Sequence, residues 1–291
     1  MRTLAAVALL GLASALPLSA QAPDPVAVQA RALLSTNQAE KAADLLEKAV
    51  AAKPNDAARH YLLGEAYGSM AQQASMFRAA SLAGKVRDEF AKAVQLDPNM
   101  TDARFGLMEF YLQAPSIMGG DETKAREQAM EIRKRDALMG HRAFAMLAMA
   151  KKDVNAARAE YVVGVRENPA SAKAHYAYAA FLMTADKNFK GALDEFDAAL
   201  HADPNYMPAV FQIGHVAAIS GTNFARGEES LQKYLAYKPA TDEPGLHRAH
   251  YWLGVIYEKQ GKKAEARTRY QTSLRLLSGQ KDVAEALKRV S

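Results

Sequence analysis

The sequence has no cysteine among its 291 residues, only one tryptophan, and few β-branched residues. The absence of cysteine excludes disulfide bonds, thiol catalysis and a lipid-anchored cysteine. The scarcity of β-branched residues, together with abundant alanine, favours helices over strands. The formal net charge is +5 (37 basic minus 32 acidic side chains), and the longest basic clusters are Arg133-Lys134-Arg135 and Lys262-Lys263. Because nucleic-acid binding requires basic residues gathered on one face, we expect no nucleic-acid partner.

Motifs that carry catalysis or bind cofactors are also absent from the sequence. It contains no nucleophile elbow (G-x-S-x-G), zinc-protease motif (H-E-x-x-H), phosphate-binding P-loop or dinucleotide-binding glycine motif (G-x-G-x-x-G). We therefore assign no catalytic residue and no cofactor-binding residue, and we predict that the protein is not an enzyme.

The N-terminus has the pattern of a cleavable signal peptide. Arg2 forms a short basic region, and the apolar run over residues 4–16 is too short to span a membrane. We expect cleavage after Ala20, because a cut after Ala22 would leave Pro23 next to the scissile bond. We therefore predict that residues 1–20 are a signal peptide and that the protein is exported, either periplasmic or secreted. No later apolar run approaches the length of a membrane span, so we expect no membrane-spanning segment.

A short pattern recurs along the rest of the chain. The segments 47–56 (EKAVAAKPND), 91–100 (AKAVQLDPNM) and 197–206 (DAALHADPNY) share the same arrangement of alanines and a proline near their end. Prolines at this place in the pattern are separated by 44, 71, 35 and 35 residues: Pro54, Pro98, Pro169, Pro204 and Pro239. The spacing of 71 corresponds to two periods with one proline missing, so the repeat length is about 35 residues.

The repeats resemble the tetratricopeptide repeat family. YLLGEAY (61–67) and YWLGVIY (251–257) match the first helix of its motif, and GKKAEARTRYQTSL (261–274) matches the second helix. The resemblance covers nearly all of residues 23–291 and implies an all-α, right-handed solenoid of about seven helical hairpins. The repeats start near residues 23, 57, 101, 138, 172, 207 and 247. Residues 281–290 are expected to form a C-terminal cap helix, which an open solenoid end requires.

Small residues and histidines recur once per repeat. Gly64 and Gly254 let two helices approach closely, and Phe90 and Tyr270 are expected to fill the space that remains. The recurring histidines are His60, His141, His175 and His250. Because packed helices lie about 10 Å apart, these histidines are too far from one another to share one ion, and we predict no metal site.

In the tetratricopeptide repeat family the first helix of each repeat lines the concave surface, and the residue after the histidine position points there. From the second repeat onwards, this position holds five aromatic residues and one cation: Tyr61, Phe105, Arg142, Tyr176, Phe211 and Tyr251. We take these six as candidate partner-binding residues, with Arg142 orienting the partner. Aromatic residues are common at this position in the family, so a purely structural role is the alternative.

Some members of the family bind a peptide C-terminus through lysine and asparagine at fixed concave positions. Here the corresponding inner positions carry Glu65, Glu109, Met146, Ala180, His215 and Val255. We therefore do not predict a clamp for a terminal carboxylate.

Two repeats are longer than is usual for the family. The second has about ten extra residues where its two helices meet, which should lengthen both helices. In the third, APSIMGG (114–120) is inserted: Pro115 should stop one helix and Asp121 should cap the next. We expect Ile117 and Met118 to cover the apolar side of the lengthened hairpin. The alternative is that this apolar edge is itself an exposed binding surface.

The leading functional hypothesis is an exported, non-enzymatic scaffold or adaptor that binds a peptide or partner protein in its concave groove. GGDETKA (119–125) resembles a stretch of repeat proteins associated with TRAP-type transporters. That resemblance implies the second hypothesis, a component that handles a solute or ligand for a periplasmic transporter. A third hypothesis is a homo-oligomer assembled through the groove or a terminal repeat. A small ligand retained in a native mass spectrum would favour the second hypothesis, and light scattering separates the third from the first.

Overall fold

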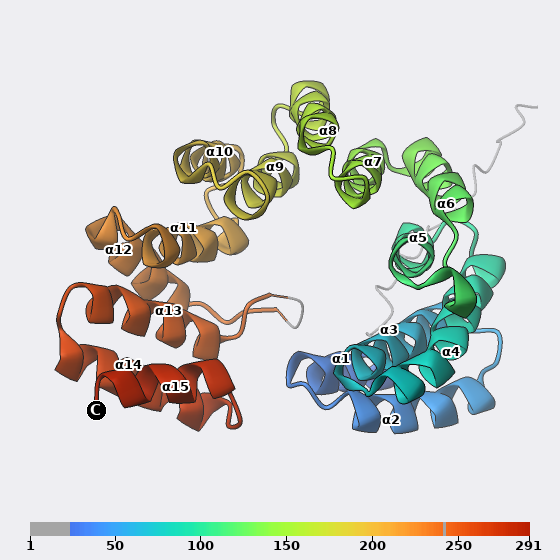
Figure 1. Ribbon diagram of the computed structural model, residues 1–291, viewed down its shortest axis with the longest axis horizontal. Helices are drawn as coiled ribbons and strands as arrows, with labels where there is room; N and C mark the ends of the chain where they lie inside the picture. Colours follow the sequence, from blue (N-terminus) through green and yellow to red (C-terminus); the bar gives the residue numbers. More distant parts are fainter. Residues whose placement is uncertain (1–23, 241–242) are drawn as a thin grey trace, which may run out of the picture.

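The computed structural model describes residues 24–240 and 243–291, so the predicted signal peptide, residues 1–20, lies outside the described residues. Within these ranges the chain is helical and has no strand (Figure 1). The helices are α1 (Pro25–Ser35), α2 (Ala39–Ala52), α3 (Ala57–Gln73), α4 (Met76–Leu96), α5 (Thr101–Gln113), α6 (Glu122–Arg135), α7 (Ala137–Ala150), α8 (Val154–Glu167), α9 (Ala172–Thr184), α10 (Phe189–Ala202), α11 (Met207–Ser220), α12 (Phe224–Leu235), α13 (Leu246–Lys259), α14 (Lys263–Leu276) and α15 (Lys281–Arg289), with one 3-10 turn, η1 (Ser116–Met118). No helix in the described part of the chain is both long enough and apolar enough to cross a membrane.

The helices confirm the predicted solenoid. They pair in chain order into seven hairpins, from α1–α2 to α13–α14. Four of the expected repeat starts coincide with the first residues of α3, α5, α9 and α11, and the other three lie within two residues of the starts of α1, α7 and α13. The last helix, α15, packs against α14 and buries Val283, Ala286 and Val290, so it caps the end of the solenoid as predicted.

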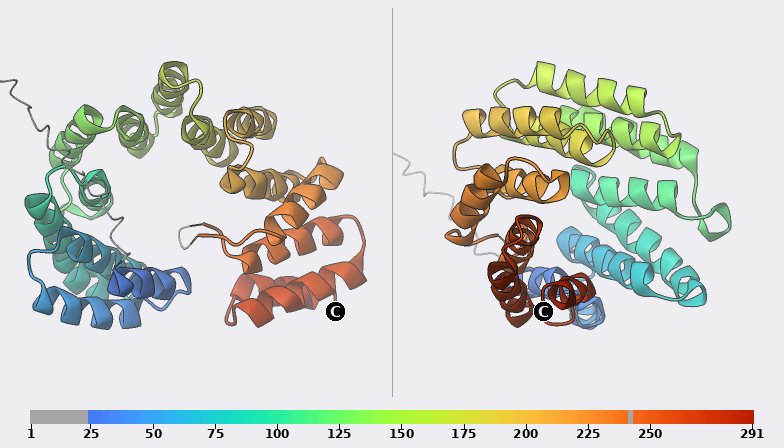
Figure 2. Two further views of the ribbon diagram at one scale, coloured as in Figure 1. Left: turned by 180° about the vertical axis from the view of Figure 1, so that it is seen from behind. Right: turned by 60° about the vertical axis from the view of Figure 1, so that its left-hand side comes forward.

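The hairpins stack side by side into an arc (Figures 1 and 2). First helices such as α5, α7 and α9 lie on the inner side of the arc, and second helices such as α6, α8 and α10 lie on the outer side. From α3 onwards, each first helix packs against its own partner and also against the second helix of the preceding hairpin. The apolar core therefore continues from hairpin to hairpin, and the first helices form most of the inner surface.

A close contact between a glycine and a ring joins the two helices of two hairpins, α3–α4 and α13–α14. A Cβ atom added to Gly64 in α3 would lie 2.7 Å from Cδ1 of Phe90 in α4. One added to Gly254 in α13 would lie 2.6 Å from Cε1 of Tyr270 in α14. Both rings are buried. A hydrogen atom is thus the only side chain that fits at either glycine, and the predicted pairing of small residue and ring is confirmed.

The ends of the helices follow from local chemistry. Side-chain oxygens accept hydrogen bonds from free amides at the starts of α1, α3, α6, α7, α8, α9 and α10. These bonds satisfy donors that the first turn of a helix leaves unpaired. At the other end, a proline stands two residues after the last residue of α2, α4, α8 and α10. Proline lacks the backbone donor that another helical turn would need.

Two of the four recurring histidines, His60 and His175, connect the two helices of their hairpin to the preceding turn. Nδ1 of His60 in α3 lies 2.5 Å from Oε2 of Glu89 in α4, and its Nε2 lies 2.9 Å from the carbonyl oxygen of Pro54. Equivalent contacts recur at His175 (Glu195 and Pro169), whereas His141 contacts two carboxylates of α8 (Glu160 and Glu167) and Nδ1 of His250 is buried without a hydrogen-bond partner among the described residues. His60, His141 and His175 each contact a carboxylate in the second helix of their own hairpin. A structural role within the hairpin therefore accounts for their recurrence once per repeat.

We predict that Gly64→Ala destabilises the protein, because the added methyl group would overlap with the ring of Phe90. The expected loss is about 1–3 kcal/mol in the free energy of unfolding, measured by urea denaturation with circular dichroism. The matched control is Gly68→Ala, one turn further along α3, where nothing lies within 4 Å of an added Cβ. That change should leave stability unchanged or raise it by up to about 1 kcal/mol. Equal effects of the two substitutions would contradict the close glycine–ring contact.

Candidate functional site

A groove lies on the inner face of the N-terminal half, where α3, α4, α5 and the start of α7 meet. It encloses a cavity of about 630 Å³. Three of the six predicted partner-binding residues line this cavity: Tyr61 of α3, Phe105 of α5 and Arg142 of α7. Phe90 and Phe110 add two further rings to its wall. The structure therefore brings half of the predicted residues together in one place.

A second cavity, of about 570 Å³, continues the groove towards α1. It shares Tyr61, Glu65, Ser69 and Asp102 with the first cavity and adds Arg31 of α1. The groove therefore crosses the inner helices of four consecutive hairpins, α1, α3, α5 and α7.

Acidic side chains line the groove beside its rings. Oη of Tyr61 donates a hydrogen bond of 2.7 Å to Oε1 of Glu65. Burial raises the pKa of the Glu65 carboxyl, and the negative charges of Asp102 and Glu109 raise it further. Burial also raises the pKa of Glu109. The sequence pattern placed Glu65 and Glu109 on the inner surface but did not assign them to the site, and their clustering emerges only when the two helices are packed together.

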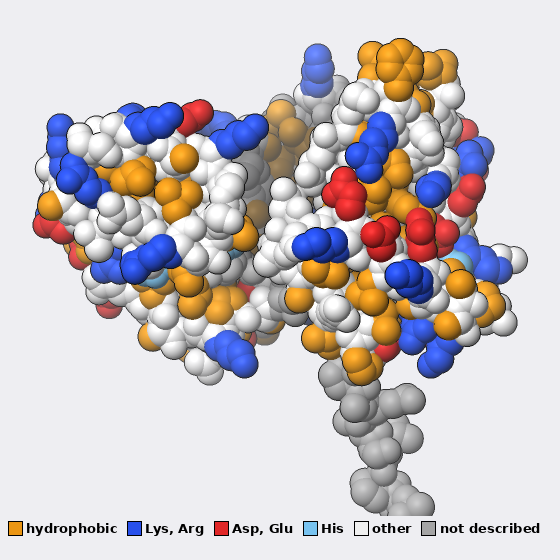
Figure 3. Space-filling view, turned by 90° about the horizontal axis from the view of Figure 1, so that it is seen from below, with side chains coloured by type: hydrophobic (Ala, Val, Ile, Leu, Met, Phe, Trp, Pro, Cys, Tyr) orange, Lys and Arg blue, Asp and Glu red, His pale blue; other side chains and the backbone are white. Residues whose placement is uncertain are grey.

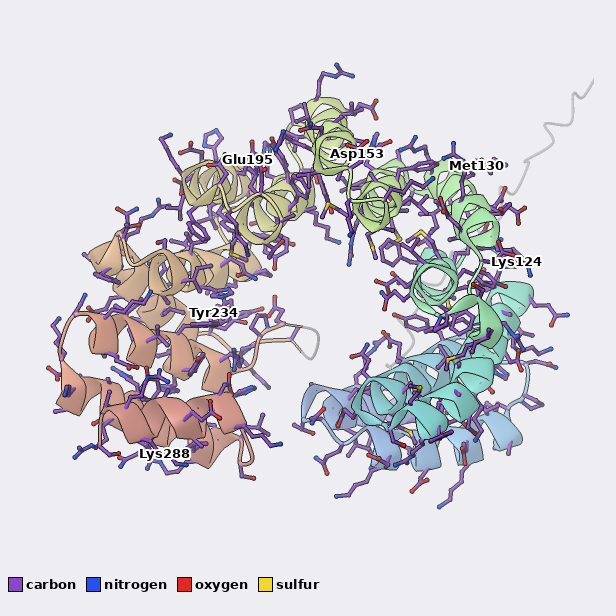
Figure 4. The ribbon with its side chains drawn as sticks, viewed as in Figure 1. Lys124, Met130, Asp153, Glu195, Tyr234 and Lys288 are labelled. Atoms are coloured by element: carbon purple, nitrogen blue, oxygen red, sulfur yellow. The ribbon has the colours of Figure 1, made fainter. Side chains whose placement is uncertain are left out.

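Arg142 is the exposed member of the three predicted residues in the groove. Its guanidinium lies over the ring of Phe105, 4.6 Å from the ring centroid, a favourable cation–π arrangement. Phe105 is only 6% exposed, so it forms the floor of the groove under the arginine. In Figure 4 the side chains of α5 and α7 reach the inner side of the arc, whereas the labelled Lys124 and Met130 belong to the outer helix α6.

The remaining three predicted residues lie in the C-terminal half and do not line this groove. Phe211 is only 4% exposed, and its ring packs against Tyr234 with centroids 5.1 Å apart. The ring of Phe211 therefore fills the space between α11 and α12 and exposes little surface on the inner face, and its role in partner binding stays a prediction.

Tyr176 and Tyr251 are half-buried in the C-terminal half. Arg248 covers Tyr251 and Trp252, with its guanidinium 4.6 Å and 5.3 Å from the two ring centroids. His215 stacks on Trp252 at a centroid distance of 4.1 Å. Burial, and then the charge of Arg248, lowers the pKa of His215 to about 4, so this imidazole is neutral at pH 7. The rings of Tyr176, Tyr251, Trp252 and His215 pack against other side chains of the protein and keep part of their surface exposed.

The loop 114–121 closes one end of the groove. Helix α5 ends at Gln113, two residues before Pro115. Gly119 has a φ of 97°, in the left-handed region that glycine adopts without strain. Asp121 then accepts hydrogen bonds from two amides of α6. The predicted helix stop, turn and cap are confirmed.

Only one of the two apolar residues in this loop packs as predicted. Met118 lines the cavity and packs against the core of α3 and α4, whereas Ile117 is 92% exposed. The prediction for Ile117 is wrong, because successive residues of a 3-10 turn point about 120° apart, so Ile117 faces outwards when Met118 faces inwards.

The lengthened hairpin ends in an exposed apolar tip. Helices α3 and α4 have 17 and 21 residues, so both run on as predicted. At their junction Met76 is 74% and Phe77 is 91% exposed. The hairpin and the loop 114–121 project from the same edge of the arc (Figure 2, right), and apolar side chains cover the projecting tip of the N-terminal half in Figure 3.

Within residues 24–240 and 243–291, no group of three histidine, aspartate or glutamate side chains is arranged to hold a metal ion.

Comparison with known families agrees with this architecture. Two family profiles, each described as tetratricopeptide repeat, match residues 142–206 and 247–280. These two segments are therefore similar to tetratricopeptide repeats. The matched segments include α8 to α10 and α13 to α14, so most of the groove lies in hairpins that the profiles do not cover. No curated protein matches the chain in sequence.

Solved structures of similar shape are distant in sequence. The human IFIT1 dimer with PPP-AAAA is 19% identical, with a TM-score of 0.59 over 88% of this chain and 59% of that chain. Yeast Tom70 is 14% identical, with a TM-score of 0.57 over 94% of this chain and 65% of that one. The APC/C hetero-tetramer Cut9-Hcn1 is 14% identical, with a TM-score of 0.53 over 92% and 49%. This chain therefore spans between 49% and 65% of the length of these chains, and the likeness shows a common fold.

We predict that alanine substitutions at the neighbouring loop residues Met118 and Ile117 differ in how much they lower the free energy of unfolding. Met118→Ala should lower the free energy of unfolding by about 1–2 kcal/mol, because it removes packing against α3 and α4. Ile117→Ala should change it by no more than about 0.5 kcal/mol, since Ile117 is exposed. In urea denaturation, combining Ile117→Ala with Phe77→Ala should give additive effects. A loss at Ile117 as large as that at Met118 would contradict the outward direction of this side chain.

Proposed function

We propose that the protein is an exported scaffold that binds an extended segment of a partner protein in the groove of its N-terminal half. The observation that carries this proposal is the groove itself, which crosses α1, α3, α5 and α7 with rings in its wall and charged side chains beside them. Tyr61, Phe105 and Arg142 are the central contacts. Tyr176 and Tyr251 are further contacts for a longer segment that continues along the inner face.

The dimensions of the groove suit an extended peptide. Packed helices lie about 10 Å apart, so a path across four inner helices is about 30 Å long. An extended chain advances about 3.3 Å per residue, so about nine residues fill this path. A single small solute would occupy one of the two linked cavities and leave the other open.

The repeat fold supports a binding role without identifying the partner. Tetratricopeptide repeats generally form non-enzymatic scaffolds, whose stacked hairpins offer an extended concave surface. Similar structures hold chemically different partners, since Cut9-Hcn1 is a protein hetero-tetramer and the IFIT1 dimer holds PPP-AAAA. In this chain the carboxylates of Glu65, Asp102 and Glu109 would repel a phosphate chain. The charge of the groove therefore favours a protein segment over a nucleic acid.

A photo-crosslinking amino acid tests where the partner binds. We predict that p-benzoylphenylalanine in place of Gln113, an exposed residue lining the groove, crosslinks to a protein of the exported fraction. Mass spectrometry should map the crosslink to one peptide of that protein. The matched control is the same substitution at Glu127, which is exposed on the outer helix α6.

Crosslinking from Gln113 but not from Glu127 would support binding in the groove. Equal crosslinking from both positions, or crosslinking from Glu127 alone, would contradict it. A small molecule retained by the purified protein, without a protein crosslink, would favour solute handling instead.

We predict that the exported protein begins at Gln21. The reason is the basic Arg2, the short apolar run over residues 4–16 and the small residues that end at Ala20. The intact mass of the protein recovered from the periplasm or the medium checks this expectation. Protein that is recovered there but still begins with Met1 would contradict cleavage.

A further inference from the structure

The groove combines aromatic surface with carboxylates that have no close basic partner. Glu65 of α3 and Glu109 of α5 are half-buried in its wall, and Asp102 lies in the first turn of α5. Among the described residues, no hydrogen bond reaches the carboxylate of Glu109, and its only compensation is the more distant charge of Arg142. Glu65 receives one hydrogen bond, from the hydroxyl of Tyr61.

The two arginines of the groove do not neutralise these carboxylates at close range. Arg142 lies over the ring of Phe105, which attracts the guanidinium and keeps it from closing on Glu109. Arg31 lines the second cavity together with Glu65 and Asp102, and its charge acts on Glu65 only at longer range. Neither arginine forms an ion pair within 4.0 Å with an acidic side chain in the described part of the chain.

Negative charge in this wall is therefore poorly compensated. Burial raises the pKa of both Glu65 and Glu109, and this effect outweighs the lowering by the hydrogen bond from Tyr61 and by the charges of Arg31 and Arg142. A cation that enters the groove would compensate this charge through charge-assisted hydrogen bonds. The rings beside the carboxylates offer an apolar surface, which suits the long aliphatic stem of lysine or arginine.

We propose that the groove accepts a lysine or arginine side chain of the bound segment. Its stem lies against Tyr61 and Phe105, and its charged head lies between Glu65 and Glu109. This inference rests on the proposed function and specifies what the groove selects. An acidic segment would meet like charges at Glu65, Asp102 and Glu109, and would be rejected for that reason.

Selection from a phage library of random decapeptides, with the mature protein as bait, tests the inference. Enriched peptides should carry a lysine or arginine at one fixed position with apolar neighbours. Each enriched peptide is then synthesised with that residue and with norleucine in its place, which keeps the stem and removes the charge. Norleucine should weaken binding to the wild-type protein about tenfold or more in calorimetry.

Matched variants of the protein test whether the preference for lysine over norleucine arises from the carboxylates of the groove. Glu109→Gln should weaken binding of the lysine peptide about tenfold and largely abolish its advantage over norleucine. Glu127→Gln on the outer helix α6 should change neither. Thermal melting shows in each case that the variant is folded.

The affinity of the lysine peptide for the groove should also depend on pH. A carboxyl group whose pKa is raised takes up a proton as the pH falls, and the neutral form does not attract a cation. Lowering the pH from about 8 to about 5 should therefore weaken binding of the lysine peptide to the wild-type protein. The same change should have a smaller effect on Glu109→Gln.

Two different results would contradict the proposed selectivity, and only one of them would also contradict peptide binding. Enriched peptides that carry acidic or apolar residues at the fixed position, or that bind wild-type protein and Glu109→Gln equally, overturn the selectivity for a cation and leave peptide binding intact. If no peptide is enriched and the crosslink from Gln113 also fails, both the selectivity and the proposed function are overturned.

Discussion

The close contact between a glycine of one helix and a bulky side chain of its partner sets the geometry of the hairpins. At Gly64 and Gly254 the facing ring occupies the space that a Cβ atom would need. Because protein interiors are packed as densely as molecular crystals, such a contact leaves the two helices little freedom to shift. A glycine packs in the same way on Leu231 at Gly214, so the contact fixes the helix spacing in three of the hairpins that stack into the arc (Figure 1).

In the N-terminal half the same contact also forms the groove. The ring of Phe90 lies against Gly64 of its own hairpin and against Gly106 of the next, with added Cβ atoms falling 2.7 Å and 2.8 Å from it. The same side chain lines the cavity. The wall of the groove is therefore part of the packing that joins two hairpins, which keeps Tyr61 and Phe105 at fixed positions before any partner arrives. A preformed surface of this kind binds with a smaller loss of conformational freedom than a mobile one.

The periodic part of the structure could be predicted from the sequence, because most repeats share the same local features: a small residue for close approach, a ring that fills the remaining space and a proline after the second helix. Exposure could not be predicted in the same way. Tyr61 and Phe211 occupy equivalent positions, yet Phe211 is buried, because exposure depends on side chains of neighbouring helices that differ between repeats. Glu65 and Glu109 were recognisable as inner residues, but their proximity depends on how α3 and α5 pack. Only the local 3-10 turn decides that Met118 faces the core and Ile117 the solvent.

Recognition by the inner helices of the N-terminal half is tested most directly by hydrogen exchange of the protein with and without a saturating bound segment. Amide protection reports which parts of the backbone a ligand covers or orders. Added protection is expected in α1, α3, α5 and α7, with unchanged exchange in the outer helices α10, α12 and α14. Added protection confined to those outer helices, or to the C-terminal half, would contradict a groove formed by the inner helices as the site of binding.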